Sequence, residues 1–342
     1  MNQAANTQNR RRRKERRAAM FFRSSHQRAA KHSGRRWIRV LLALLGVVSW
    51  LTSPGCVGLL LAEDSGGSSW ELRLVSVLEG FGEPECVCVD PATGAAYVSN
   101  VVSPKYQADK VNAADGAGFI SRLAPGGKLD ALHWIDSTPQ APLNSLKGMC
   151  ILNGVLYGAD IARVVRYDIV THKALPPINI PAAVRLNDMA SDGRCVYVSD
   201  TGGHKIYRLD GEQVSEFAPL DGANGITVAD GRFYAVSTTQ HDLYEINPRG
   251  GGKPRAFGLA KHFTGLDGIE TLPDGSWIVS DVRGHKVCHV AADRKTVRVL
   301  AELQYAADIG LDRQRNLLMV PLFWDSRVMV YQLHPSGSTT TR

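Results

Sequence analysis

Short runs of alternating apolar and polar residues recur along most of the chain, and turn-forming residues separate one run from the next. Near the middle, residues 186–191 lead into an Asp192-Gly193 turn and then into residues 196–200, where valines alternate with Tyr197 and Ser199. Period-two alternation is typical of a strand with one buried face, and Asp-Gly between two such runs strongly favours a hairpin. The pattern therefore predicts a β-hairpin over residues 186–200.

This hairpin belongs to a unit that occurs six times. Each copy starts with a polar residue at the head of its first strand, and the equivalent positions are Glu85, Lys147, Asn187, Asn224, Asp267 and Asp308. Their spacings of 62, 40, 37, 43 and 41 residues are close to the roughly 40–50 residues of one four-stranded propeller blade. Six such blades arranged radially leave only short sheet edges. We predict an all-β fold, a six-bladed β-propeller.

The last unit lacks a fourth strand, because the chain runs out after residues 328–333. Residues 71–77 alternate as a strand ahead of the first unit and have no blade of their own. We therefore expect this N-terminal strand to complete the sixth blade and close the ring. The propeller then spans residues 71–334, and residues 335–342 form a disordered polar tail.

The first 70 residues have a different composition. Residues 1–37 form an Arg-rich arm that we expect to be disordered, and residues 63–70 read as a flexible linker. Between them, residues 40–62 carry no charge, which at about 1.5 Å per residue is enough to span a bilayer core of about 30 Å. We assign residues 38–62 to a signal peptide or a transmembrane anchor, two alternatives that share a basic flank. Either one delivers the propeller outside the cytoplasm, to the periplasm or the extracellular space, or anchored to the membrane.

The formal net charge of +7 comes from the arm alone. Residues 1–39 contain thirteen basic residues and one acid, so the remainder carries 27 basic against 32 acidic residues. A mildly acidic propeller is a poor match for nucleic acid, and we expect no nucleic-acid partner. Five cysteines follow the apolar segment. The odd number favours buried free thiols, although a Cys88–Cys150 bridge would suit an oxidising compartment. We expect a monomer.

The six equivalent polar residues should form a ring, because the first strand of each propeller blade lines the central channel. The ring would hold three carboxylates, two carboxamides and one ammonium. Such groups are rarely buried unless they are paired or bind a metal. Oxygen ligands of this kind suit Ca²⁺, Mg²⁺ or Mn²⁺. The alternative is a hydrogen-bonded polar plug in which Lys147 bridges carboxylates and no metal binds.

Three motifs resemble the senescence marker protein/gluconolactonase family, which includes regucalcin. They are Arg185-Leu186-Asn187-Asp188, Asn224-Gly225 and Asp267-Gly268, in order on successive units, and the resemblance extends over roughly residues 74–333. It implies a hydrolase of sugar lactones or small esters, with its site at the mouth of the channel. It also implies one divalent cation, Ca²⁺, Mg²⁺, Mn²⁺ or Zn²⁺, with the ligands Glu85, Asn187, Asn224 and Asp267.

The same resemblance implies roles for individual residues toward a small-molecule substrate. Asp267 would assist water attack as the catalytic residue, and Arg185 would contact the substrate. Lys147 and Asp308 are not part of the family pattern. We place them beside the substrate and expect Lys147 either to neutralise Asp308 next to the metal or to take the place of the cation.

Two departures from the family pattern support a second interpretation of the function. The segment Gly82-Glu83-Pro84-Glu85-Cys86 offers two glutamates, of which Glu85 matches the register of the ring. Its Pro-Glu order is similar to that of strictosidine-synthase-like propellers. The alternative function is a non-catalytic propeller that binds a ligand or a protein partner at the channel mouth.

The remaining repeated residues have structural interpretations. His204, His241 and His285 precede the third strand of three units, and Asp160, Asp200 and Asp281 end the second strands. We expect both sets to be turn residues. Insertions at residues 101–118 and 137–145 interrupt the repeat, and they are either loops on the binding face or solvated loops without a role.

Overall fold

The computed structural model describes residues 70–104, 106–107 and 111–336. The predicted basic arm, the signal or anchor segment and the linker, apart from Trp70, lie outside these residues. Within them, the two helices are single 3₁₀ turns, η1 (Ala260–His262) and η2 (Phe323–Asp325). Neither of these described helices is long or apolar enough to cross a membrane.

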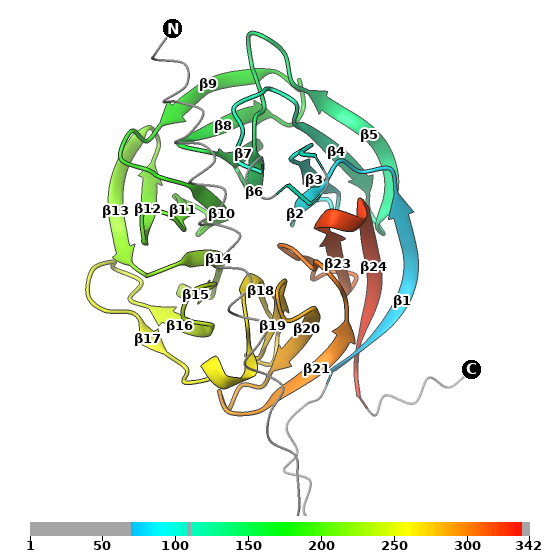
Figure 1. The fold of residues 1–342 in the computed structure, drawn as a ribbon, viewed down its shortest axis with the longest axis vertical. Coiled ribbons are helices and arrows are strands. Elements are labelled where there is room, and N and C mark those ends of the chain that lie inside the picture. The colour runs from blue at the N-terminus through cyan, green and yellow to red at the C-terminus, as the bar shows by residue number, and fades with distance from the viewer. Residues whose placement is uncertain (1–69, 105, 108–110, 337–342) are drawn as a thin grey trace, which may run out of the picture. The chain divides into compact units, whose positions relative to one another are not determined.

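The described residues form six four-stranded antiparallel sheets around a central channel (Figure 1). Blade 1 contains β2 (Pro84–Val89), β3 (Ala96–Asn100), β4 (Phe119–Ala124) and β5 (Lys128–Asp136). Blade 2 contains β6 (Leu146–Leu152), β7 (Val155–Asp160), β8 (Arg163–Asp168) and β9 (Ala174–Asn179). Blade 3 contains β10 (Leu186–Ser191), β11 (Val196–Asp200), β12 (Lys205–Asp210) and β13 (Gln213–Pro219).

The other three blades follow the same inner-to-outer order, which confirms the predicted six-bladed propeller. Blade 4 contains β14 (Ala223–Ala229), β15 (Arg232–Ser237), β16 (Asp242–Ile246) and β17 (Arg255–Ala256). Blade 5 contains β18 (Leu266–Thr271), β19 (Trp277–Asp281), β20 (Lys286–Val290) and β21 (Val297–Glu302). Blade 6 contains β22 (Gly310–Asp312), β23 (Leu317–Leu322), β24 (Arg327–Pro335) and β1 (Trp70–Glu79).

The ring is closed by its first strand, as predicted. β1 pairs antiparallel with β24 from Trp70 opposite Pro335 to Glu79 opposite Arg327, so the two ends of the propeller lie side by side (Figure 1). The Trp70 indole also donates a hydrogen bond of 2.8 Å to Asp274 of the neighbouring blade. The closing strand is therefore held both within blade 6 and across to blade 5.

The hydrophobic core is divided among the spaces between neighbouring blades, because both faces of each sheet are covered. Between blades 3 and 4, for example, the rings of Tyr197, Phe217 and Phe233 pack with centroids 4.7–5.1 Å apart. Similar clusters fill the other spaces between blades. This packing explains why four of the second strands, β3, β11, β19 and β23, are buried along their whole length.

Five of the six described inner strands, β2, β6, β10, β14 and β18, bulge at the predicted ring position. In blade 3, the register shifts between Leu186 and Met189, so that Asn187 and Asp188 together stand opposite Ser199. The Asp188 N–H, which has lost its ladder partner, donates to the Ser199 hydroxyl at 2.9 Å. The same bond joins Cys86 N to Ser99 Oγ at 3.0 Å and Gly268 N to Ser280 Oγ at 2.8 Å. The bulge allows two consecutive residues of an inner strand to reach the channel.

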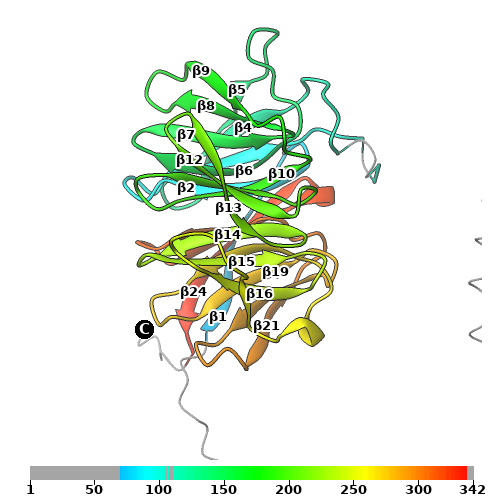
Figure 2. The ribbon, with the colours of Figure 1, turned by 90° about the vertical axis from the view of Figure 1, so that its left-hand side faces the viewer.

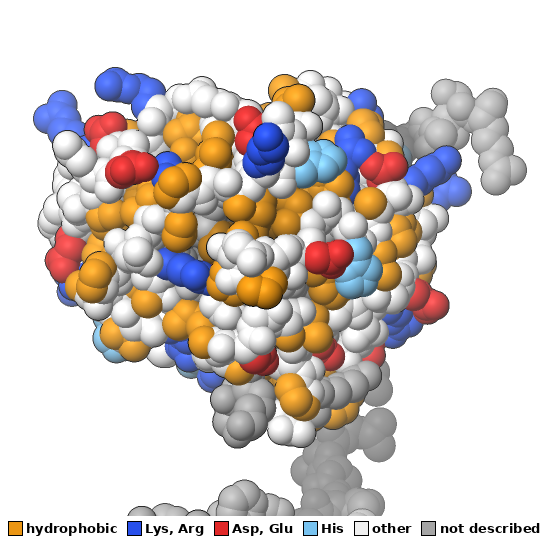
Figure 3. Space-filling view, turned by 90° about the horizontal axis from the view of Figure 1, so that it is seen from above, with side chains coloured by type: hydrophobic (Ala, Val, Ile, Leu, Met, Phe, Trp, Pro, Cys, Tyr) orange, Lys and Arg blue, Asp and Glu red, His pale blue; other side chains and the backbone are white. Residues whose placement is uncertain are grey.

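The described residues of the insertion at 101–118 lie on the face where the inner strands begin, which we call the upstream face. Val101 N donates to Glu83 O at 3.2 Å, and Tyr106 packs against Trp324 of η2 with ring centroids 5.6 Å apart. Figure 2 shows this loop and η2 projecting on the same side of the disc. On the rim of the propeller that Figure 3 displays, acidic and basic side chains are interspersed.

Candidate functional site

The predicted ring residues meet in the channel. Glu85, Lys147, Asn224 and Asp267 are each less than a tenth exposed. The Lys147 ammonium lies 3.3 Å from Glu85 Oε1, and the Asn224 amide donates to Asp267 Oδ1 at 2.8 Å. These contacts join neighbouring blades. They place Glu85, rather than Glu83, in register with the other ring residues.

The expected pairing of Lys147 with Asp308 is wrong, because Lys147 contacts Glu85 instead. The backbone explains the difference. Asp308 N donates to Glu85 O at 2.9 Å and Val87 N donates to Asp308 O at 3.3 Å, so Asp308 forms a parallel bridge with Cys86. Asp308 is thereby set level with Cys86, one residue deeper in the channel than Glu85. A carboxylate oxygen of Asp308 lies within 4.8 Å of one of Asp188.

Two oxygen atoms of the ring are buried without a hydrogen-bond partner among the described residues, Glu85 Oε2 and Asn224 Oδ1. Leaving such acceptors unpaired is costly, by about 1–3 kcal/mol each. A cation between them would satisfy both. The half-buried Asn187 uses its amide nitrogen to donate to Thr201 at 3.0 Å, which leaves its oxygen available. The residues present therefore fit an oxygen-ligated divalent cation.

Burial raises the pKa values of the ring carboxyl groups Glu85 and Asp267. Burial, followed by the charge of Glu85, raises the pKa of Asp267 to about 7, against the opposing effects of Lys147 and Asn224. Burial also raises the pKa of Glu85, although Lys147 opposes the shift. Near neutral pH, Asp267 can therefore both lose and accept a proton, which is the property required of a general base.

Arg185 lies exposed at the upstream mouth, in the loop that leads into β10. This loop is held by Asp200, which is fully buried and accepts N–H bonds from Val184, Arg185 and Gly203 at 2.8–2.9 Å. The corresponding bonds hold the loops before β6 and β18 through Asp160 and Asp281. These aspartates therefore have the predicted turn role, and they position the segments that precede the ring residues.

The histidines and cysteines also match their structural interpretations. His204, His241 and His285 have positive φ angles of 58°, 58° and 55°, as expected of turn residues. All five cysteines of the described residues are free and buried, so the Cys88–Cys150 bridge is not formed.

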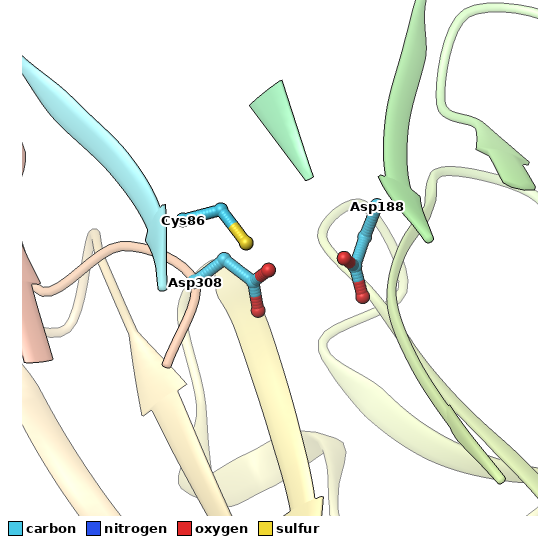
Figure 4. A group of neighbouring side chains, drawn as sticks. All are labelled: Cys86, Asp188 and Asp308. Carbon is cyan, nitrogen blue, oxygen red and sulfur yellow. The ribbon is translucent and has the colours of Figure 1, made fainter. Parts of the chain in front are cut away.

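A second level of the channel was not predicted. Cys86, Asp188 and Asp308 come from three different blades, and one ligand atom of each lies within 4.8 Å of the others (Figure 4). The sequence carried a weak signal, because three of the six residues that follow the ring positions are glycines. A Cβ on Gly148 would lie 2.4 Å from Asp188 Cα, and one on Gly268 would lie 2.5 Å from Asp308 Oδ1. These glycines leave room for the second-level carboxylates.

A cavity of about 250 Å³ adjoins this second level. Its lining includes Cys86, Asp188 and Asp308, and it continues along the inner strands to Glu270 and Arg313, where those strands end. None of Glu85, Lys147, Asn224 and Asp267 lines this cavity. We expected the binding site at the upstream mouth, but this cavity lies toward the opposite, downstream face.

No protein-family model and no curated protein matches the chain. Solved structures share its fold. A gluconolactonase from Xanthomonas campestris is 14% identical with a TM-score of 0.56, and the match covers 77% of this chain and 95% of that one. An inactive virginiamycin B lyase from Staphylococcus aureus, solved with quinupristin, is 12% identical with a TM-score of 0.53, covering 78% and 99%. A chain of a nidogen/laminin complex is 16% identical with a TM-score of 0.50, covering 65% and 92%. At these identities, the likeness extends to the fold alone.

Proposed function

We propose that this protein is a divalent-cation-dependent hydrolase of a sugar lactone or a small ester. The cation would be held in the channel ring by Glu85, Asn187, Asn224 and Asp267. The observation that carries the proposal is the pair of orphaned buried acceptors, Glu85 Oε2 and Asn224 Oδ1, which face a ring otherwise rich in oxygen ligands. The resemblance to the gluconolactonase family and the fold shared with a gluconolactonase support the substrate class.

A divalent cation bound there would polarise the substrate carbonyl and stabilise the developing oxyanion. Asp267 accepts the proton of the attacking water as the water oxygen bonds to the carbonyl carbon. The carbon–oxygen bond to the alcohol portion then breaks, and the proton passes from Asp267 to the departing oxygen. Arg185, exposed at the upstream mouth, holds a carboxylate or hydroxyl of the substrate through its forked donors. We also place Lys147 and Asp308 beside the substrate, with Asp308 level with Cys86.

The place of action follows from the N-terminal sequence. Residues 40–62 are uncharged and follow a basic arm, and this pattern supports export, with or without a retained membrane anchor. A reporter that is active only outside the cytoplasm, fused to residues 1–70, should give signal. We further propose that the propeller acts as a monomer on a small molecule.

The direct test combines elemental analysis of the purified full chain with a panel of lactones and aryl esters. Hydrolysis should depend on added Ca²⁺, Mg²⁺, Mn²⁺ or Zn²⁺, and Asp267→Ala should remove both the ring cation and at least 99% of the activity. Asp168→Ala, in a surface turn, is the matched control and should leave both unchanged. Full activity in Asp267→Ala would refute the role of the ring.

A specific contact favours the second candidate, a non-catalytic propeller that binds a ligand or protein partner. The Lys147–Glu85 ion pair already places a positive charge in the ring, where it can substitute for a cation. A chain that takes up no cation at the ring and hydrolyses nothing in the panel would support this function.

A further inference from the structure

The second level of the channel brings three potential metal ligands together below the ring. Cys86 is 2% exposed, Asp188 5% and Asp308 7%, and their ligand atoms lie within 4.8 Å of one another. Figure 4 shows the Cys86 thiol on β2 and the Asp308 carboxylate on the adjacent segment that leads into β22, with the Asp188 carboxylate facing them across the channel. The three residues belong to blades 1, 3 and 6, so the complete ring is needed to assemble them.

This cluster lacks a compensating positive charge. Among the described inner strands, only β6 carries a basic side chain, Lys147, and its ammonium is bonded to Glu85. Asp188 and Asp308 each place a carboxylate oxygen within 4.8 Å of the other, and two buried like charges at this distance repel each other when no cation is present. Two carboxyl groups buried against each other are a costly arrangement, and a divalent cation would relieve it.

The Cys86 thiol and the Asp188 and Asp308 carboxylates are also positioned to bind a metal ion. No hydrogen bond reaches the Cys86 sulfur from any described residue, although the side chain is directed at the two carboxyl groups. Backbone N–H groups of Met189 and Ile226 fix the two oxygens of Asp188 at 2.6 and 2.7 Å. The glycines at positions 148 and 268 supply the space that these side chains occupy.

We propose that Cys86, Asp188 and Asp308 form a second metal site, distinct from the ring, for a thiophilic divalent cation of the Zn²⁺ class. One thiolate and two carboxylates are three of the four ligands of a tetrahedral Zn²⁺ ion, whose donors lie within about 4 Å of one another. The adjoining cavity leaves room for water as the fourth ligand. A thiolate ligand favours Zn²⁺ over Ca²⁺ or Mg²⁺, so the two sites of the channel differ in metal preference.

The ligand geometry of this site does not depend on the proposed hydrolase function. The charge balance of the channel, however, rests on the ring cation of the proposed hydrolase. Two divalent cations and Lys147 would together neutralise the Cys86 thiolate and the carboxylates of Glu85, Asp188, Asp267 and Asp308. Binding displaces the protons of the thiol and the carboxyl pair, so affinity should rise with pH.

The test uses Co²⁺ as a spectroscopic substitute for Zn²⁺ on the metal-free full chain. Co²⁺ should produce thiolate-to-cobalt charge-transfer absorption at one equivalent, and Zn²⁺ should abolish it by displacement. Cys86→Ser should eliminate the absorption, whereas Cys88→Ser, which changes another buried cysteine lining the same cavity, should retain it. Asp267→Ala should also retain it, which separates this site from the ring.

The conservative variant Asp308→Asn provides an independent arm if Cys86→Ser does not fold. It should weaken Co²⁺ binding at least tenfold. No charge-transfer absorption in the unsubstituted chain would overturn the proposal, as would its persistence in Cys86→Ser or unchanged affinity in Asp308→Asn. Loss of hydrolysis in Asp267→Ala with the cobalt absorption retained would support both sites. The converse result, absorption without any hydrolysis in the unsubstituted chain, would refute only the hydrolase.

Discussion

The ammonium of Lys147 lies 3.3 Å from Glu85 Oε1, and the two side chains are only 8% and 7% exposed. This single ion pair neutralises one of the four channel carboxyl groups and leaves Asp188, Asp267 and Asp308 without a basic partner on the inner strands. Lys147 therefore lies where it opposes a ring cation, and it also favours the ionised form of Glu85 against the effect of burial, which raises the pKa of that carboxyl group. Its removal should separate these two effects.

Lys147→Met should raise the affinity of the ring for a divalent cation at pH 8, above the pKa of about 7 of Asp267, because the repulsion between the ammonium and the cation is lost. We expect an increase of tenfold or more, equivalent to about 1.4 kcal/mol. At pH 6 the gain should shrink, because Glu85 without its ammonium partner holds its proton more firmly. Isothermal titration at both pH values measures this change. Lys205→Met, which removes a surface lysine paired with Glu216, is the control, and an equal gain in that variant would contradict the explanation.

The metal-free chain should lose stability as the pH rises from 5.5 to 8. The pKa of Asp267 is raised to about 7 from its ordinary value near 3.8, so between these values the folded chain holds a proton that the unfolded chain has released. Stability conferred by that proton falls as pH passes through 7, by about 2 kcal/mol for this residue over the stated range. Asp188, also raised to about 7 by burial, acts in the same direction.

Urea unfolding of the chelator-treated protein at the two pH values measures this loss. Asp267→Asn should remove the contribution of Asp267 to the slope of unfolding free energy against pH. The comparison also separates this contribution from that of His289, whose pKa is lowered by burial and which makes stability rise with pH. A slope that is unchanged in Asp267→Asn would show that the residue does not titrate in this range. Added divalent cation should restore stability at pH 8.

Asp200→Ala should destabilise blade 3 and loosen the loop that carries Arg185. The substitution leaves three backbone N–H groups without their acceptor, and we expect a loss of about 3 kcal/mol in the free energy of unfolding. Asp168 also accepts bonds from its own turn, but on the surface, so Asp168→Ala should cost much less. Chemical denaturation of both variants makes the comparison, and equal losses would refute a special role for the buried clamp.

The architecture was predictable because a propeller repeats its local pattern. The inner hairpins of blades 2 to 5 combine alternation with an Asp-Gly or Asn-Gly turn. The spacing of Asn187, Asn224 and Asp267 then places one ring residue in each blade. The unpaired strand at residues 71–77 and the incomplete last unit together predicted the closure of the ring. The confirmed turn roles of Asp200 and His204 follow from the same repetition.

The contacts within the channel were not predictable in the same way. Cys86, Asp188 and Asp308 are separated by 102 and 120 residues, and no local pattern relates them. A bulge of one residue in five of the six described inner strands, together with the bridge between Cys86 and Asp308, determines which side chains share a level.

The sequence by itself thus determined the number of blades, the strand that closes them and the ring residues at the heads of the inner strands, because each of these depends on periodicity along one segment. Only the tertiary structure decided that Lys147 pairs with Glu85 and that Asp308 lies beside Cys86 and Asp188. Those contacts depend on how the strands of different blades are positioned along the channel axis. That position is set by closure of the whole ring and by backbone hydrogen bonds between blade 6 and blade 1.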